Sequence, residues 1–172
     1  NRIKGVKSTR QITRAMQMVA TSKMKKAQDA AKSGRPYALL LSDIIISIAD
    51  EFEEITQSYY VQRPIKHRGI LVVGTDKGLC GALNSNLFRK LNDVDNSAKF
   101  IAVGRRASQF LGRTQRDLLA DFTLPDKPTF SDVRKIVDFL LRSYDDGTID
   151  TIEILYSSFV NTLRQEPEDR KS

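Results

Sequence analysis

Apolar and small residues in the first part of the chain recur in steps of three and four. This first stripe consists of Ile12, Met16, Val19, Ala20, Met24, Ala27 and Ala31. Such spacing predicts a helix with one apolar side. The stripe is narrow and rich in alanine, which favours close packing against another helix over burial in a domain core.

A second stripe with the same spacing follows the tripeptide Gly34-Arg35-Pro36. It consists of Leu41, Ile44, Ile45, Ile48, Phe52 and Ile55. We therefore expect the helix to pause or bend at Pro36 and then to continue. A single helix over residues 3–55 would be roughly 80 Å long, far longer than a small domain needs. This length is typical of a coiled-coil strand.

Short continuous apolar runs replace the helical spacing further along the chain. They are Gly69–Val73 (GILVV), Phe100–Val103 (FIAV) and Thr151–Tyr156 (TIEILY). Runs of this kind predict buried strands. Helices are expected at residues 83–91, at 107–111 and after a capping box at 129–132, whereas the stretch around Pro125 and Pro128 reads as turns. Strands that alternate with helices imply a parallel sheet with right-handed crossovers.

The predicted fold class is α/β: a long N-terminal coiled-coil helix plus a small three-layer Rossmann-like domain with a mainly parallel sheet. We expect the long helix over residues 1–58, the α/β domain over 66–165 and a charged tail over 166–172. At 172 residues the chain has room for one ordinary core and an appendage.

Positive charge is concentrated at the N-terminal end. Residues 1–35 hold ten Lys and Arg against the single Asp29, a net charge of +9, so the rest of the chain sums to −2 against the total of +7. A basic segment of this kind favours an acidic partner, which could be nucleic acid, an anionic membrane or an acidic protein surface. The first 36 residues contain no aromatic residue for base stacking and few bulky apolar residues for lipid. Packing against another helix therefore fits better.

Candidate chemistry is sparse. The segment VVGTDKGLCGALN, residues 72–84, puts a glycine-rich turn between a strand and a helix, but its glycine spacing matches neither the dinucleotide fingerprint nor a P-loop. One cysteine, Cys80, and one histidine, His67, cannot form a zinc set and give little support to a Cys-His pair. We expect no catalytic residue, no metal and no cofactor. A small nucleotide-binding enzyme and a nucleic-acid-binding module remain the rival hypotheses.

Three segments carry a family resemblance. QITRAMQMVATSKMKKAQ with GRPYA resembles the N-terminal helix of the gamma subunit of F-type ATP synthases, especially bacterial forms. VVGTDKGLCGALNSNLFRKL is similar to the first strand, turn and helix of that subunit's globular domain, and FVNTLRQEP to the close of a later strand. The family's long C-terminal helix has no counterpart in this sequence, and we expect it to follow the charged tail.

The resemblance implies a non-catalytic rotor. In that family, gamma couples transmembrane proton flow to ATP synthesis or hydrolysis by turning inside three alpha and three beta subunits. Epsilon and the membrane c-ring are the further implied partners, and nucleic acid is not among them. Membrane association would arise only through the complex, on the cytoplasmic face of a bacterial inner membrane, with a mitochondrial or chloroplast membrane as the alternative.

The resemblance also assigns residues. Ile12, Thr13, Met16, Val19 and Ala20 fall in the coiled-coil segment nearest the catalytic ring. Lys23, Lys25 and Lys26 match the basic cluster that faces the acidic levers of the beta subunits. Gly78, Leu79, Cys80 and Gly81 match a turn of the globular domain near the base of the shaft.

Overall fold

A computed structural model of the protein describes residues 2–51, 63–95, 97–161 and 164–171, with side chains of the long helix described to residue 47. The chain divides into two units, residues 1–61 and 62–172, each of which is considered by itself. No helix in the described ranges is long and apolar enough to cross a lipid bilayer.

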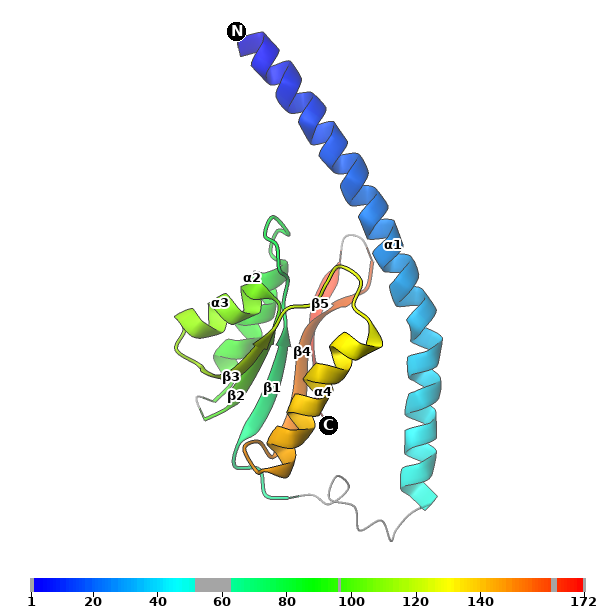
Figure 1. Ribbon diagram of the computed structural model, residues 1–172, viewed down its shortest axis with the longest axis vertical. Helices are drawn as coiled ribbons and strands as arrows, with labels where there is room; N and C mark the ends of the chain where they lie inside the picture. Colours follow the sequence, from blue (N-terminus) through cyan, green and yellow to red (C-terminus); the bar gives the residue numbers. More distant parts are fainter. Residues whose placement is uncertain (1, 52–62, 96, 162–163, 172) are drawn as a thin grey trace. The chain divides into compact units, whose positions relative to one another are not determined.

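The first unit is one helix, α1 (Arg2–Glu51), which confirms the predicted long helix as far as the described residues reach (Figure 1). At about 1.5 Å per residue, its 50 residues span roughly 75 Å. The helix continues beyond Pro36, as predicted, and of the expected pause or bend at this residue the pause does not occur. Proline removes one backbone hydrogen bond there, and the flanking turns hold the helix together. Phe52 and Ile55 lie outside the described residues.

The second unit is a three-layer α/β domain. Its elements are β1 (Arg68–Val73), α2 (Leu83–Arg89), the short 3-10 helix η1 (Lys90–Asp93), β2 (Lys99–Val103), α3 (Arg105–Arg113), β3 (Asp117–Phe122), α4 (Phe130–Asp145), β4 (Thr151–Phe159) and β5 (Gln165–Lys171). The described strands form one sheet in the order β3-β2-β1-β4-β5. The pairs among β3, β2, β1 and β4 are parallel, and β5 is antiparallel to β4. This mainly parallel sheet confirms the predicted fold class.

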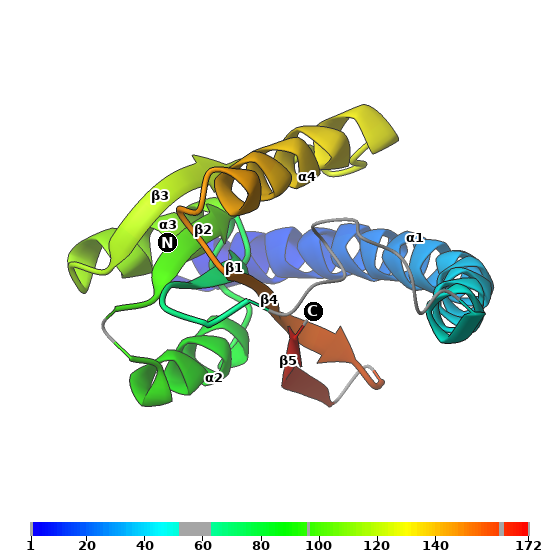
Figure 2. The same ribbon diagram turned by 90° about the horizontal axis from the view of Figure 1, so that it is seen from below.

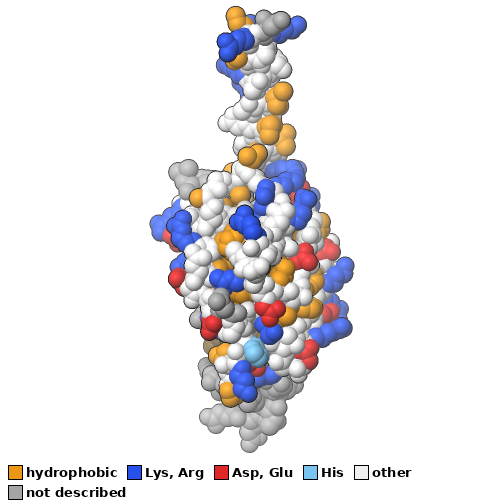
Figure 3. Space-filling model, turned by 90° about the vertical axis from the view of Figure 1, so that its left-hand side faces the viewer, with side chains coloured by type: hydrophobic (Ala, Val, Ile, Leu, Met, Phe, Trp, Pro, Cys, Tyr) orange, Lys and Arg blue, Asp and Glu red, His pale blue; other side chains and the backbone are white. Residues whose placement is uncertain are grey.

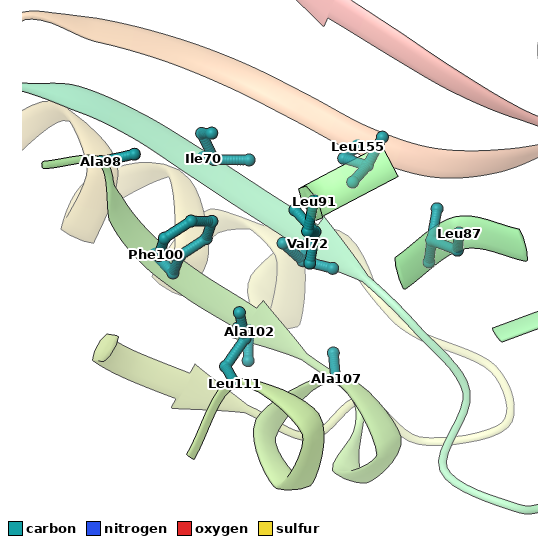
Figure 4. Packing of buried hydrophobic residues seen from close by; sticks show 10 residues of the cluster. All are labelled: Ile70, Val72, Leu87, Leu91, Ala98, Phe100, Ala102, Ala107, Leu111 and Leu155. Atoms are coloured by element: carbon teal, nitrogen blue, oxygen red, sulfur yellow. The ribbon is translucent and has the colours of Figure 1, made fainter. Parts of the chain in front are cut away.

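Successive side chains of β1 point to opposite faces of the sheet and pack into two hydrophobic cores, one on each face. Ile70 and Val72 join a cluster with α2, η1 and α3, which Figure 4 shows from close by. Leu71 lies on the other face, where Ile136 and Leu140 of α4 pack. Figure 2 shows α2 and α4 on opposite sides of the sheet. Helices on both faces explain why the central strands read as continuous apolar runs.

Two strands differ from the sequence expectation. β3 lies where no strand was predicted, because its short apolar run Leu118–Ala120 stands between Asp117 and Asp121 and its side chains are mostly half-buried. β5 replaces most of the expected charged tail, residues 166–172. Its seven residues pair with β4 through the backbone, from Gln165 opposite Phe159 to Lys171 opposite Glu153. An edge strand needs little apolar sequence, and charges and a proline suit it.

Candidate functional site: the exposed helix and the β1–α2 turn

The stripe on α1 is open to solvent. Every described side chain from Arg2 to Ser47 is exposed except that of Gln28, which is half-buried. Ile12, Met16 and Val19 are 58%, 62% and 59% exposed. Hydrophobic side chains lie along the helix beside Lys and Arg in Figure 3. An exposed apolar patch of this length marks a surface that binds a partner.

Three threonine hydroxyls of α1 are hydrogen-bonded within the helix itself. The Thr13 hydroxyl donates to the carbonyl oxygen of Thr9 at 2.8 Å, and the Thr9 hydroxyl donates to that of Gly5 at 3.0 Å. Thr21 bonds back to Gln17 in the same way at 2.8 Å. Thr13, whose hydroxyl is bonded to the helix backbone, and the small residue Ala20 together form a low surface that a second helix can approach closely.

The three lysines of the predicted basic cluster do not share one side of the helix. At about 100° per residue, Lys23 lies within about 20° of Met16, on the side of the apolar stripe. Lys26 lies about 60° from Lys23, and Lys25 about 160° from it. A partner that packs on the stripe would thus meet Lys23 at its seam, whereas Lys25 would stay accessible from the other side.

A hydrogen-bonded network fixes the base of the turn between β1 and α2. The Asn84 side chain accepts from the Thr75 amide at 3.3 Å and donates to the Thr75 hydroxyl at 2.8 Å. It also donates to the Cys80 sulfur at 3.3 Å. The Thr75 hydroxyl donates to the Lys77 carbonyl oxygen at 2.7 Å. Cys80 is thereby half-buried inside a structural network.

The tip of the same turn displays one apolar side chain. Leu79 adopts a φ of 62° and is 103% exposed. Non-glycine residues with positive φ are uncommon, and an exposed leucine in that conformation gains nothing from its own fold. Gly81, with a φ of 60°, supplies the second left-handed residue of the turn. The four predicted turn residues, Gly78 to Gly81, thus come together, in a different unit from the predicted α1 residues.

Neighbouring groups fill the places where a phosphate would approach this edge of the sheet. The Asp76 carboxylate accepts from the Arg105 amide at 3.0 Å, so it occupies the N-terminus of α3. A Cβ atom at Gly104 would lie 2.5 Å from the Gly74 carbonyl oxygen, and one at Gly78 would lie 2.7 Å from the Arg106 guanidinium. A carboxylate at the helix N-terminus repels anions. Gly78 and Gly104 therefore serve close packing.

The sequence interpretation missed Thr75, Asp76 and Asn84 as the residues that hold the turn. Their signal was present, because a Thr-Asp pair lies one residue after a buried strand and Asn84 lies in the first turn of the next helix. Within the described ranges, no three His, Cys, Asp or Glu side chains come together in a group that could hold a metal ion.

These features define a class of protein: a long helix with an exposed apolar stripe, joined to a Rossmann-like α/β domain. The same fold occurs in a chain of the Tetrahymena thermophila mitochondrial ATP synthase central stalk and c-ring, at a TM-score of 0.72 and 23% identity, over 94% of this chain and 71% of that one. A family model described as ATP synthase matches residues 1–172. The chain therefore belongs to the ATP synthase family.

Curated relatives carry a more specific name. The "ATP synthase gamma chain" of Opitutus terrae is 49% identical over 166 residues, which are 96% of this chain and 56% of that protein. The protein of the same name from Methylacidiphilum infernorum is 41% identical over 176 residues, covering 99% of this chain and 60% of that protein. The chain thus spans somewhat more than half the length of these relatives.

Proposed function

We propose that the chain forms part of the central rotor shaft of an F-type ATP synthase, as a gamma subunit that couples proton flow to ATP synthesis or hydrolysis. The observation that carries the proposal is the apolar stripe of α1, which stays exposed along a helix of 50 residues. The family membership and the names of the curated relatives support it.

The stripe needs a helix partner to become stable. Full burial of a Val, Ile or Met side chain is worth about 1.5 to 3 kcal/mol, and α1 gains none of this by itself. A second helix of a gamma subunit, packed antiparallel on Ile12, Met16 and Val19, would supply it. The small Ala20 and the internally bonded Thr13 would let the two backbones come close.

The lysines suit a rotating contact. Exposed ion pairs are worth about 0 to 1 kcal/mol each, so cations can attract acidic beta-subunit levers without locking to them. Lys25 faces away from the stripe and Lys26 flanks it, so these two lysines are the better candidates for this role. Lys23 lies near the seam, where its charge would border the packed helices.

The β1–α2 turn is proposed as a second contact, at the base of the shaft. Its Thr75–Asn84 network holds the backbone rigid, and Leu79 projects as the apolar contact residue. A turn with a fixed backbone has only the side-chain rotamers left to order on binding, which lowers the entropy cost of its use in an interface. Gly78, Cys80 and Gly81 shape the turn and take no part in chemistry under this proposal.

Catalysis would belong to the partner subunits. We propose that the chain holds no catalytic residue, metal or cofactor and contacts alpha and beta subunits, three of each, together with epsilon and the membrane c-ring. Its membrane association would follow from that assembly, on the cytoplasmic face of a bacterial inner membrane. The bacterial sources of the curated relatives favour this location over an organelle.

Reconstitution tests the proposal. A full-length gamma subunit that contains this sequence is mixed with an alpha/beta hexamer, and steady-state ATPase activity is compared with that of the hexamer alone. We expect strong stimulation and, in equilibrium dialysis, no ATP binding by the isolated chain. Absence of both a complex and stimulation would refute the rotor function. Binding of ATP by the chain alone would favour the rival enzyme hypothesis.

Charge reversal tests the lysines. Replacing Lys23, Lys25 and Lys26 with Glu should leave the domain folded and weaken proton pumping by the assembled complex. The matched control replaces Lys4, Lys7 and Lys32 with Glu, which changes the net charge of α1 equally at other positions. Normal pumping with the first variant would show that the cluster is only a solvated face. If the lever contact lies opposite the stripe, the single variant Lys25→Glu should reduce proton pumping more than Lys23→Glu does.

A further inference from the structure

The segment by which the chain enters the α/β domain is tied to the far end of α4. The Arg63 guanidinium lies 3.6 Å from the centroid of the Tyr144 ring and donates to the Tyr144 carbonyl oxygen at 3.0 Å. These residues are 81 positions apart in sequence. A guanidinium that stacks on a ring and also bonds to the backbone is held in one geometry.

A second tie follows three residues later. One carboxylate oxygen of Asp150 accepts from the backbone amides of Lys66 and His67, at 2.9 and 2.8 Å. The Asp150 amide in turn donates to the His67 carbonyl oxygen at 2.8 Å. Hydrogen bonds to a carboxylate are stronger than those between neutral groups. The contacts of Arg63, Lys66 and His67 with Tyr144 and Asp150 are called the entry clasp.

The clasp is anchored in the core on the α4 face of the sheet. Tyr144 lies in the last turn of α4, whose Leu140 is buried, and Asp150 follows Ile149, which is fully buried. β1 begins at Arg68, directly after the clasped residues. A force applied to the chain before Arg63 would otherwise peel residues 63–67 away and then load the first pairs of β1 with β4 and β2.

We propose that the entry clasp is the mechanical joint that passes load between α1 and the α/β domain. The clasp distributes a pull on the chain over α4 and the α4–β4 turn, so that the first residue pairs of the central strand β1 stay intact. Arg63, Tyr144 and Asp150 are thereby positioning residues for torque transmission. This inference rests on the proposed rotor function, because only a rotor loads the joint.

The first test measures the joint in the chain itself. In Asp150→Ala, amide hydrogen exchange at Lys66 and His67 should become roughly tenfold faster, as expected for the loss of charge-assisted hydrogen bonds. Exchange at Leu71 and Val72 should not change. Unchanged protection at Lys66 and His67 would refute the clasp as the element that holds this segment.

The second test measures coupling. The double variant Arg63→Ala, Asp150→Ala is introduced into a full-length gamma subunit, assembled with its complex and reconstituted into vesicles. We expect hydrolysis without a gradient to stay within about twofold of the unmodified complex, and protons pumped per ATP to fall as the opposing gradient rises. Normal pumping at a high gradient would refute the inference. Failure of the unmodified chain to assemble would instead refute the rotor function.

A matched control separates load transmission from stability. Thr129→Ala removes the capping box at the opposite end of α4, where the Thr129 hydroxyl accepts from the Asp132 amide and the Asp132 carboxylate accepts from the Thr129 amide at 2.9 Å. This variant should lower Tm comparably and leave pumping under load unchanged. Equal loss of pumping in both variants would mean that the clasp acts only through domain stability.

Discussion

The long helix and the α/β domain use similar apolar residues with opposite results. In the domain, Val72, Leu91, Phe100 and Ile101 have no exposed surface, whereas in α1 Ile12, Met16 and Val19 each expose more than half. The domain thus stabilises itself through its own core, and α1 depends on helix propensity and on partners. The difference locates the interaction surface, because a segment that cannot bury its apolar side by itself needs a further helix to cover it.

The largest expected effect tests the two regions directly. Phe100→Ala should destabilise the domain by about 3 to 5 kcal/mol, because it removes a ring at the centre of the core and leaves a cavity. Met16→Ala should change the stability of the isolated chain by less than about 0.5 kcal/mol. Urea unfolding followed by circular dichroism and tyrosine fluorescence gives both values. A large effect of Met16→Ala in the monomeric chain would contradict the comparison.

The next largest expected effect is a loss of domain stability when a partly buried ion pair of the α/β domain is broken. Arg68 donates two hydrogen bonds to Glu153, at 2.6 and 2.5 Å, and Glu153 is 4% exposed. Hydrogen bonding to Glu153 raises the pKa of Arg68. Arg68→Ala leaves a buried carboxylate without its partner and should cost about 2 to 3 kcal/mol, less than for a fully buried pair because the Arg68 side chain is 31% exposed.

A double variant completes that test. Replacing both Arg68 and Glu153 with Leu removes the unpaired charge and should recover most of the lost stability, as seen for buried ion pairs in general. The urea unfolding midpoints of Arg68→Leu, Glu153→Leu and the double variant measure the coupling. Additive losses in the double variant would show that the pair makes no specific contribution.

The sequence predicted the parts of the fold that depend on apolar pattern. α1 and the strands β1, β2 and β4 follow from continuous or helical apolar spacing, and the capping box at Thr129 was found from its two polar residues. β3 and β5 were missed, since edge strands carry mixed or charged residues and owe their pairing to neighbours distant in sequence. Strand order and partner choice are tertiary properties that local pattern does not contain.

The same limit applies to the candidate sites. Gly78 to Gly81 were predicted as a turn, but the left-handed conformation and exposure of Leu79 depend on the network of Thr75 and Asn84, nine residues apart. The entry clasp joins residues more than 80 positions apart. The predicted lysines share one helix, yet its 3.6-residue repeat sends them to different sides.

Replacing one glycine in each region should change stability by a smaller amount, with opposite signs in the two regions. Gly34→Ala lies in α1, where a Cβ atom would meet nothing within 4 Å, and should stabilise the helix locally by about 1 kcal/mol. Gly104→Ala lies before α3 with a φ of 90°, and its Cβ atom would lie 2.5 Å from the Gly74 carbonyl oxygen. It should destabilise the domain by about 2 kcal/mol through backbone strain. Amide exchange in α1 and urea unfolding of the domain measure the two changes.

The smallest expected effect is a loss of stability of the α/β domain at acidic pH. Hydrogen bonds from the Thr129 backbone and hydroxyl lower the pKa of Asp132, and those from the His67 and Lys66 amides lower the pKa of Asp150. A carboxyl whose folded pKa lies below its unfolded value, about 3.9, stabilises the fold above that value. This stabilisation is lost as pH falls from about 4 through the lowered folded pKa.

Urea midpoints between pH 6 and pH 2 test this dependence. The domain should weaken below about pH 4, and the double variant Asp132→Asn, Asp150→Asn should show a flatter profile over the same range. The control variant Asp29→Asn changes an exposed carboxyl of α1 and should leave the midpoint of the domain unaltered at every pH. An unchanged slope in the double variant would mean that the acid sensitivity arises at other carboxyls. A change of slope with Asp29→Asn would show that α1 and the domain unfold together, and the two regions would then no longer be energetically separate.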